Sequence, residues 1–338
     1  MKKDYVINMK EIIGITTTIP VEIIFASGNI PKDLNNIFIT DETPIDYVES
    51  AEINGFSRNM CAWIKGIYSA VKKHNIKTVV AVTEGDCSNS NSLIEILRDE
   101  GVNVISFAYP YSRDKNLLTQ EIEKFSSYFN VSKDEIAVSK IKCDEARKLA
   151  HEIDRMTWND NVVTGKENHL WLINTSDFMS DLDLFKDQAN EFISKCKKRE
   201  KKEFKHRIGY IGIPPIVSDI YDFVEENNAR VVFNEIQRQF AMPKSLSLRG
   251  AEDNIIEQYY NFTYPYSIFG RLKDIQQQIK TRNLTGLIHY TQSFCHRQMD
   301  DIILRKYIDI PIITLECDKP GVLSSRNKMK LETFLGEL

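Results

Sequence analysis

The chain has 338 residues, of which 42% are hydrophobic and 27% are charged. This length exceeds what one compact core usually holds, so we expect two core-forming units joined by a helical segment. The formal net charge of −4 and the pI near 6.0 provide no overall attraction for nucleic acid. The one dense basic run, residues 195–207, carries no interleaved aromatic platform, so we interpret it as a solvated helix end and expect no nucleic-acid partner.

The first residues, MKKDYVINMKEIIG, contain an aspartate and lack the long apolar stretch of a secretion signal. No later window reaches the roughly 18 consecutive apolar residues that a membrane-spanning helix needs. We therefore expect a cytoplasmic protein with no membrane partner. Cysteines in that reducing compartment more often bind metal or carry out redox chemistry than form disulfides.

The first third of the sequence alternates between strand-like and helix-like patterns. Near-continuous apolar runs predict strands, and apolar residues at helical spacing predict helices. The predicted strands of this part are 12–17, 35–40, 77–87 and 102–110. The predicted helices are 20–28, with Pro20 in its first turn, 57–75 and 92–101.

Strand signals stop between residues 114 and 205, where helical patterns follow one another. One of them opens with SKDE at 132–135, a capping-box sequence, and continues to about Met156. Alternation returns at His206 and continues to the end of the sequence. The predicted elements there are a strand with its turn at 206–216 and strands at 229–236, 285–294 and 311–318. Helices are predicted at 217–228, 300–308 and 327–338, with a further helical stretch before the third strand.

The overall pattern predicts an α/β fold. Buried parallel strands read as continuous Val/Ile-rich runs because helices cover both faces of the sheet. We therefore predict two Rossmann-like or flavodoxin-like parallel-sheet domains, at 1–113 and 206–338, joined by a helical connector at 114–205.

Three of the six cysteines follow predicted strands. Cys87, Cys295 and Cys317 each stand where an apolar run gives way to a polar turn, and Cys61 lies in the first turns of a helix. In open α/β sheets the functional crevice lies beyond the carboxyl ends of the strands. A helix N-terminus also favours a thiolate. These cysteines are therefore candidates for a metal or redox site, whereas Cys143 and Cys196, inside helical runs, are expected to be structural.

Each candidate also has a structural interpretation, because a lone cysteine at a strand end is commonly a small buried hydrophobe. The paired C-x2-C knuckle of zinc fingers is absent, so a metal site would have to be assembled from distant parts of the chain. For Cys87 the polar flanking residues Gly85, Asp86, Ser88 and Asn89 indicate an exposed turn, so packing and metal or redox function are about equally favoured.

Along essentially its whole length the chain resembles the iron–sulfur subunits of the 2-hydroxyacyl-CoA dehydratase and benzoyl-CoA reductase family, including the D-component of 2-hydroxyglutaryl-CoA dehydratase. The resemblance rests on the order and separation of several segments. They are PVEIIFASGNIP, NMCAWIK, VVAVTEGDCSNSNSL, SFAYP, HRIGYIGIPP with VVFNE, LIHYTQSFCH and PIITLECDKPGVLSSRNKMKLETFLGEL.

The resemblance implies that Cys61, Cys87 and Cys295 hold a [4Fe-4S] cluster. Three thiolates for four irons leave one iron open to water, sulfide or a substrate oxygen. An ATP-hydrolysing activator iron–sulfur protein is then expected to donate one low-potential electron, which the cluster passes to an acyl-CoA thioester. The resulting ketyl radical expels a hydroxyl group. A homodimer, or a heterodimer with a related subunit, is the implied assembly.

Other interpretations remain open at this point. The segments FCHRQMDD and LECDKPG are more like the branch of double-cubane cluster proteins, which reduce small molecules with an [8Fe-9S] double cubane. Such a cluster needs more than three thiolates, and Cys317 is either an extra ligand or a packed cysteine. The chain is alternatively a non-catalytic subunit that relays or stores electrons. Zinc on the same cysteines is a poorer interpretation, because structural zinc takes a closed set of four ligands.

Polar residues beside the cysteines have two interpretations each. His296 and Arg297 either cap the following helix or donate hydrogen bonds to cluster sulfurs, and capping is favoured. Glu84 and Asp86 either position the turn or transfer protons, and the turn role is favoured. No Gly-rich phosphate loop follows the strand before Ile213 and no GxxxxGK[ST] occurs, so we expect ATP use to belong to a partner.

Overall fold

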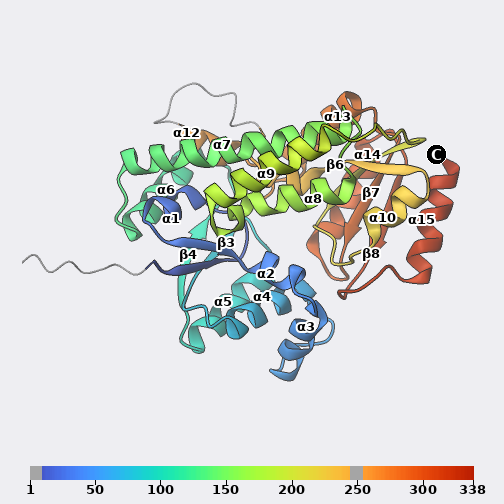
Figure 1. Cartoon of the computed structure of the whole chain (residues 1–338). Coiled ribbons are helices and arrows are strands. Elements are labelled where there is room, and N and C mark those ends of the chain that lie inside the picture. Colours follow the sequence, from blue (N-terminus) through green and yellow to red (C-terminus); the bar gives the residue numbers. More distant parts are fainter. Residues whose placement is uncertain (1–9, 244–253) are drawn as a thin grey trace, which may run out of the picture.

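The computed structural model describes residues 10–243 and 254–338 (Figure 1). Residues 1–9, which open the predicted first domain and contain most of the stretch assessed as a secretion signal, lie outside the described residues. The first part of the chain contains β1 (Ile12–Ile15), α1 (Val21–Ala26), β2 (Ile30–Asp33), α2 (Leu34–Thr40), α3 (Pro44–Ile53), α4 (Ala62–Lys73), β3 (Thr78–Glu84), α5 (Ser88–Asp99) and β4 (Asn103–Ala108).

Helices make up the middle of the chain, and strands and helices alternate again after it. The middle helices are α6 (Lys115–Tyr128), α7 (Lys133–Trp158), α8 (Gly165–Ile173) and α9 (Leu182–Cys196), with short 3-10 turns η1 (Asn174–Ser176) and η2 (Phe178–Ser180). The remaining elements are β5 (His206–Gly212), α10 (Ile220–Glu226), β6 (Ala229–Asn234), α11 (Glu235–Phe240), α12 (Asn254–Asn261), α13 (Ile268–Arg282), β7 (Gly286–Thr291), η4 (His296–Met299), α14 (Asp300–Tyr307), β8 (Ile312–Glu316) and α15 (Ser325–Glu337).

The strands form two four-stranded sheets with the same topology. The orders are β2-β1-β3-β4 and β6-β5-β7-β8, and every adjacent pair is parallel. The predicted α/β fold with two parallel sheets is therefore confirmed. In each sheet the strands that come first and third in the chain, β1 and β3 or β5 and β7, lie side by side at the centre. The second strand of each sheet lies on one side of this central pair and the fourth strand on the other. The β1/β3 and β5/β7 junctions are thus the two topological switch points, where ligands bind in open α/β sheets.

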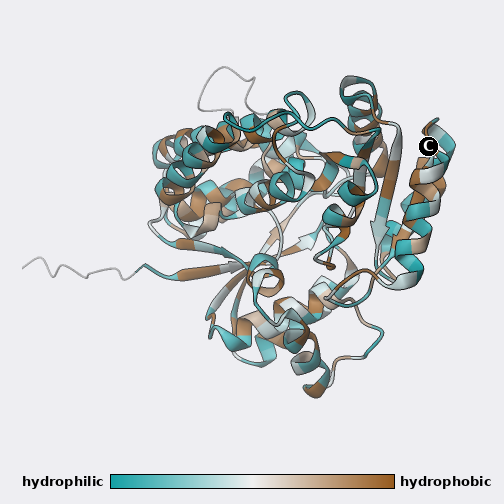
Figure 2. Cartoon of the chain, turned by 45° about the vertical axis from the view of Figure 1, so that its right-hand side comes forward, coloured by the Kyte–Doolittle hydropathy of each residue, from teal (hydrophilic) through white to brown (hydrophobic). Residues whose placement is uncertain are grey.

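Helices cover both faces of each sheet, as the apolar strands require (Figure 2). In β3, Val79 and Ala81 pack with α4 and α5, whereas Val80 and Val82 face α1, α6 and α12. In the second sheet Tyr210 and Ile288 pack with α10 and α15, while the opposite face meets α13 and α14. One hydrophobic cluster contains residues of both sheets' helical layers, so the two units are packed together.

The connecting helices hold the two sheets in position. Helix α7, the long green helix of Figure 1, contacts α1 of the first unit and β6 of the second. Its N-terminus carries the predicted capping box, with Ser132 accepting from the Glu135 N–H and the Glu135 side chain accepting from the Ser132 N–H. Helix α12 follows β6 in sequence yet packs on the first sheet, where the Tyr259 hydroxyl donates to the Ile19 carbonyl. The domain boundaries at 113/114 and 205/206 stay a prediction.

One predicted strand is wrong. Residues 35–40 form most of helix α2, and the strand of this region is the preceding segment IPKD, which pairs in parallel with β1. The segment NNIFIT, with three apolar residues at its centre, fits either a strand or a helix by composition. The start of the helix is set by Asp33, whose side chain accepts from the Asn35 N–H. Helix α3 was not predicted. Among the described residues, no helix is both long and apolar enough to cross a bilayer.

Candidate functional site

The two switch points open into one cavity of about 730 Å³. Loops after β1 and β3 line it from the first sheet, and loops after β5 and β7 line it from the second. This size is typical of a small-molecule or cofactor site. The loop segments in the lining are Thr16–Thr18, Asp86–Ser90, Ile213–Pro215 and Ser293–Arg297.

Cys61, Cys87 and Cys295, far apart in sequence, all line this cavity. Each cysteine stands immediately before a helix, at the N-cap of α4, α5 and η4 respectively. The free N–H groups and the dipole at a helix N-terminus favour negative charge. Three such termini therefore face a single cavity, and this arrangement suits thiolates and an anionic group bound to them.

The electrostatics of the thiols reflect their mutual proximity. The pKa of Cys61 is raised to about 12, chiefly by burial. The backbone N–H groups of Ile64 and Trp63 oppose this rise, and the neighbouring thiols of Cys295 and Cys87 contribute to it. Burial also raises the pKa of Cys295, and the Arg297 backbone and guanidinium oppose that shift. Thiols in this environment lose their protons when they bind a metal. The positive charge of the metal compensates the negative charge of the resulting thiolates.

Gln292 connects two of the thiol-bearing loops. Its side-chain oxygen accepts a hydrogen bond of 3.0 Å from the buried Ala62 N–H, directly after Cys61. Its carbonyl oxygen accepts from the Cys295 N–H at 3.1 Å. One residue of the second unit thus holds the start of α4 in the first unit and the turn of Cys295.

The Cys87 turn is held by Asp86, as the favoured interpretation of that carboxylate predicted. One oxygen of Asp86 accepts from the Cys87 N–H and the other from the Ser90 hydroxyl, both at 2.8 Å. Glu84 accepts from the Tyr111 N–H and so joins this turn to the end of β4.

The other three cysteines lie apart from the cavity lining. Cys143 and Cys196 are buried in the apolar cluster between α7 and α9, in agreement with a structural role. Cys317 is buried after β8, where its sulfur accepts a hydrogen bond of 3.2 Å from the Asn327 amide. Its sulfur is thus held by the second unit's own packing.

The capping interpretation of His296 and Arg297 is wrong. No side-chain cap is present at η4 or α14. Arg297 instead stacks over the Tyr264 ring, 4.1 Å from its centroid, and donates to the Tyr264 carbonyl. Asp300 pairs with the buried Arg271. Both His296 and Arg297 line the cavity beside Cys295.

Sequence reasoning missed several polar residues on the cavity wall. Asp33 lies at the end of β2, and burial raises its pKa. Asp177 accepts from the Asp33 N–H, and burial together with the Asp33 carboxylate raises the pKa of Asp177 to about 7. Thr18 lines the cavity with a buried hydroxyl that has no partner among the described residues. His169, on α8, is buried and also lines the cavity. Only the tertiary structure brings these side chains together.

The described residues do not form a site for a single metal ion. Within residues 10–243 and 254–338, no three His, Cys, Asp or Glu side chains are grouped closely enough to bind one metal ion. In a cluster each thiolate binds a different iron, so the thiols surround a volume and need not converge on one point. A zinc site would require such convergence, which the described residues do not show.

Comparison with family models adds a second, independent observation. Residues 16–338 match the model described as 2-hydroxyglutaryl-CoA dehydratase, D-component. The chain belongs to this family. Membership agrees with the resemblance seen in the sequence and associates the chain with dehydratases of CoA thioesters. A search of curated proteins returned no match. The matched residues include Cys61, Cys87 and Cys295, the three cysteines that line the cavity.

Proposed function

We propose that the chain is an iron–sulfur subunit of a 2-hydroxyacyl-CoA dehydratase-like enzyme, with Cys61, Cys87 and Cys295 as ligands of one [4Fe-4S] cluster. The observation that carries the proposal is that these three thiols, each before a helix N-terminus, line one cavity between two switch points. Family membership supports the same assignment.

When bound, the cluster would supply one-electron reduction and an open iron for an oxygen ligand. The protein's own residues hold the three cysteine-bearing loops in position around the cavity. Gln292 holds the Cys61 and Cys295 loops together, and Asp86 holds the Cys87 turn. Asp33, Asn35 and Thr18 provide a polar wall for a ligand beside the thiols.

The cavity favours a single cubane over the double-cubane alternative. Three thiols line it, and Cys317 is engaged by Asn327 away from the lining. A double cubane needs more thiolates than these three. The polar wall also favours a catalytic subunit that binds a ligand over a subunit that only relays electrons.

The test is ATP-dependent reduction by a separate activator. The chain has no GxxxxGK[ST] loop, so we expect it to need an ATP-hydrolysing iron–sulfur activator. Stopped-flow absorbance and electron paramagnetic resonance would follow the anaerobic protein mixed with such an activator, with ATP, without ATP and with a non-hydrolysable analogue. We expect reduction of the chain only with hydrolysable ATP, followed by turnover of 2-hydroxyglutaryl-CoA or another 2-hydroxyacyl-CoA.

Two results would overturn parts of this proposal. Equal reduction without ATP, or turnover with dithionite alone, contradicts activator-driven electron transfer. Reduction without turnover of any 2-hydroxyacyl-CoA, restored by adding a related subunit, would instead establish the electron-relay role.

A further inference from the structure

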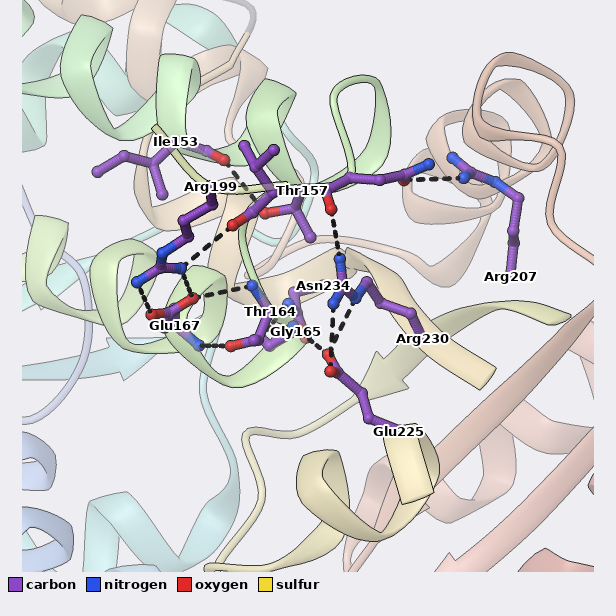
Figure 3. A network of polar contacts seen from close by, with 12 residues as sticks. Ile153, Thr157, Thr164, Gly165, Glu167, Arg199, Arg207, Glu225, Arg230 and Asn234 are labelled. Atoms are coloured by element: carbon purple, nitrogen blue, oxygen red, sulfur yellow. Dashed lines mark hydrogen bonds and ion pairs between the residues drawn. The ribbon is translucent and has the colours of Figure 1, made fainter. Parts of the chain in front are cut away.

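His169 is presented to the cavity by a firmly anchored helix. At the start of α8, Thr164 and Glu167 form a reciprocal capping box, and Arg199 donates two hydrogen bonds of 2.8 Å to Glu167 (Figure 3). The Gly165 N–H donates to Glu225, which Arg230 also binds (Figure 3). A Cβ on Gly165 would lie 2.8 Å from the Val231 carbonyl oxygen, so the helix packs directly on β6.

A directional chain of buried hydrogen bonds sets the tautomer of His169. It starts at the Gly165 carbonyl, which can only accept. The Asn234 side-chain nitrogen lies 3.5 Å from this oxygen, a long contact that orients the Asn234 NH2 group toward it. The Asn234 oxygen then accepts the Tyr221 hydroxyl proton at 2.8 Å. Having donated its only proton, the Tyr221 oxygen accepts from the Gln237 NH2 group.

The second proton of the same Gln237 NH2 group points at His169. Gln237 Nε2 lies 3.2 Å from His169 Nδ1, which must therefore accept and carry no proton. The imidazole proton is then on Nε2. The ring also stacks on Tyr221, with centroids 5.1 Å apart, and this contact holds the plane of the ring.

The His169 side chain lines the cavity, and Nε2 is its second ring nitrogen. This nitrogen has no hydrogen-bond partner in the described part of the chain, and it is not among the side-chain atoms sealed from solvent. Burial of the ring lowers the pKa of His169 to about 3, so the imidazole is neutral near pH 7. A neutral imidazole with its proton on Nε2 can donate a hydrogen bond into the cavity and cannot bind a metal through that nitrogen.

We propose that His169 donates the Nε2–H hydrogen bond to an oxygen atom of the bound ligand. If the proposed function holds, that atom is the carbonyl oxygen of the acyl-CoA thioester, which gains negative charge when the thioester accepts one electron. No covalent bond to His169 forms or breaks. A preorganised neutral donor stabilises such charge without first losing a proton or a partner.

The tautomer can be measured without any cofactor or substrate. Two-bond proton–nitrogen correlation spectra of the chain labelled with 15N-histidine distinguish the two neutral tautomers, and His169→Gln identifies the signals. We expect protonated Nε2 and no titration between pH 5 and pH 8. Gln237→Glu offers an acceptor to Nδ1, so it should move the proton to Nδ1 or raise the pKa. Gln276→Glu, on the exposed face of α13, is the matched control and should leave the His169 signals unchanged.

Activity then tests the role of the donor. In the cluster-loaded protein with activator, ATP and 2-hydroxyglutaryl-CoA, His169→Phe keeps an aromatic ring but has no donor. We expect its kcat to fall by roughly 10²-fold, the usual cost of one such donor, with KM changed less and iron content unchanged. His169→Gln retains an amide donor and should lose less.

Several outcomes would overturn the inference. Protonated Nδ1 in the native chain, as a reversed Gln237 amide would give, removes its structural basis. Iron lost from His169→Phe would make His169 a ligand, and equal kcat in both variants and the native chain would exclude the donor role. If native protein turns over no acyl-CoA while the tautomer is as expected, the proposed function fails and the cavity-facing donor stands.

Discussion

At the scale of single residues, Gln292 links the two halves of the candidate site. Its oxygen accepts from the buried Ala62 N–H, which begins α4 just after Cys61. Gln292→Leu removes the acceptor and leaves that N–H unsatisfied, at a cost of about 1–3 kcal/mol in the free energy of unfolding. Urea unfolding of the metal-free chain measures this directly.

The control for that prediction is Gln276→Leu, which removes an exposed hydrogen bond to the Tyr307 carbonyl. Its effect should stay within about 0.5 kcal/mol. Equal losses in the two variants would mean that Gln292 has no special role in joining the loops.

Prediction of single residues from the sequence succeeded for reactive side chains that stand at the boundary of a predicted strand or helix. Patterning marked Cys61, Cys87, Cys295 and Cys317 as candidates because each stands at an element boundary. The choice of Cys61, Cys87 and Cys295 as one set came from the family resemblance, and these three line one cavity. His169 and Asp33 carry no such local signal. His169 reaches its position because α8 packs on β6. Asp33 ends the four-residue strand β2, which the hydrophobic pattern of the sequence did not reveal.

At the scale of elements, the alternation of strands and helices was readable because parallel strands such as β6 and β7 are buried at every position and have apolar segments at their centres. The error at 35–40 has a physical reason. A six-residue segment with three consecutive apolar residues carries too little periodicity to separate a strand from a buried helix. The decisive features are the Asp33 cap and pairing of Ile30–Asp33 with β1, and the pairing is a tertiary property.

The end of β5 depends on a residue without a side chain. Gly212 has φ +106°, and a Cβ there would lie 2.1 Å from the Tyr290 carbonyl oxygen of β7. Gly212→Ala should therefore lower the free energy of unfolding by more than about 3 kcal/mol, because both strain and overlap oppose it. Thermal or urea unfolding measures the loss.

Gly336→Ala is the comparison variant for Gly212→Ala. Gly336 lies in α15 with open space around its Cβ position, so alanine should change the free energy of unfolding by between zero and a gain of about 1 kcal/mol. A mild effect at Gly212 similar to that at Gly336 would show that the β5/β7 junction tolerates a side chain.

At the scale of the whole molecule, the candidate site exists only through assembly of the two sheets. Each sheet alone supplies one switch point, and the cavity requires both facing each other. A net charge of −4 gives no sign of this, since the relevant field comes from three helix N-termini at the thiols. The two-sheet fold followed from hydrophobic patterning, whereas patterning alone does not predict that the two sheets face each other.

The most direct test of the central claim is the iron and acid-labile sulfide content of the anaerobically prepared chain and its single Cys→Ser variants. We expect the native chain to bind both, and Cys61→Ser, Cys87→Ser and Cys295→Ser to lose most of the iron and the brown absorption while keeping native circular dichroism. Cys143→Ser, Cys196→Ser and Cys317→Ser should retain both. Iron loss on Cys317→Ser would favour a double cubane, and a native chain without iron, or equal loss from all six variants, would contradict the assignment of the three thiols.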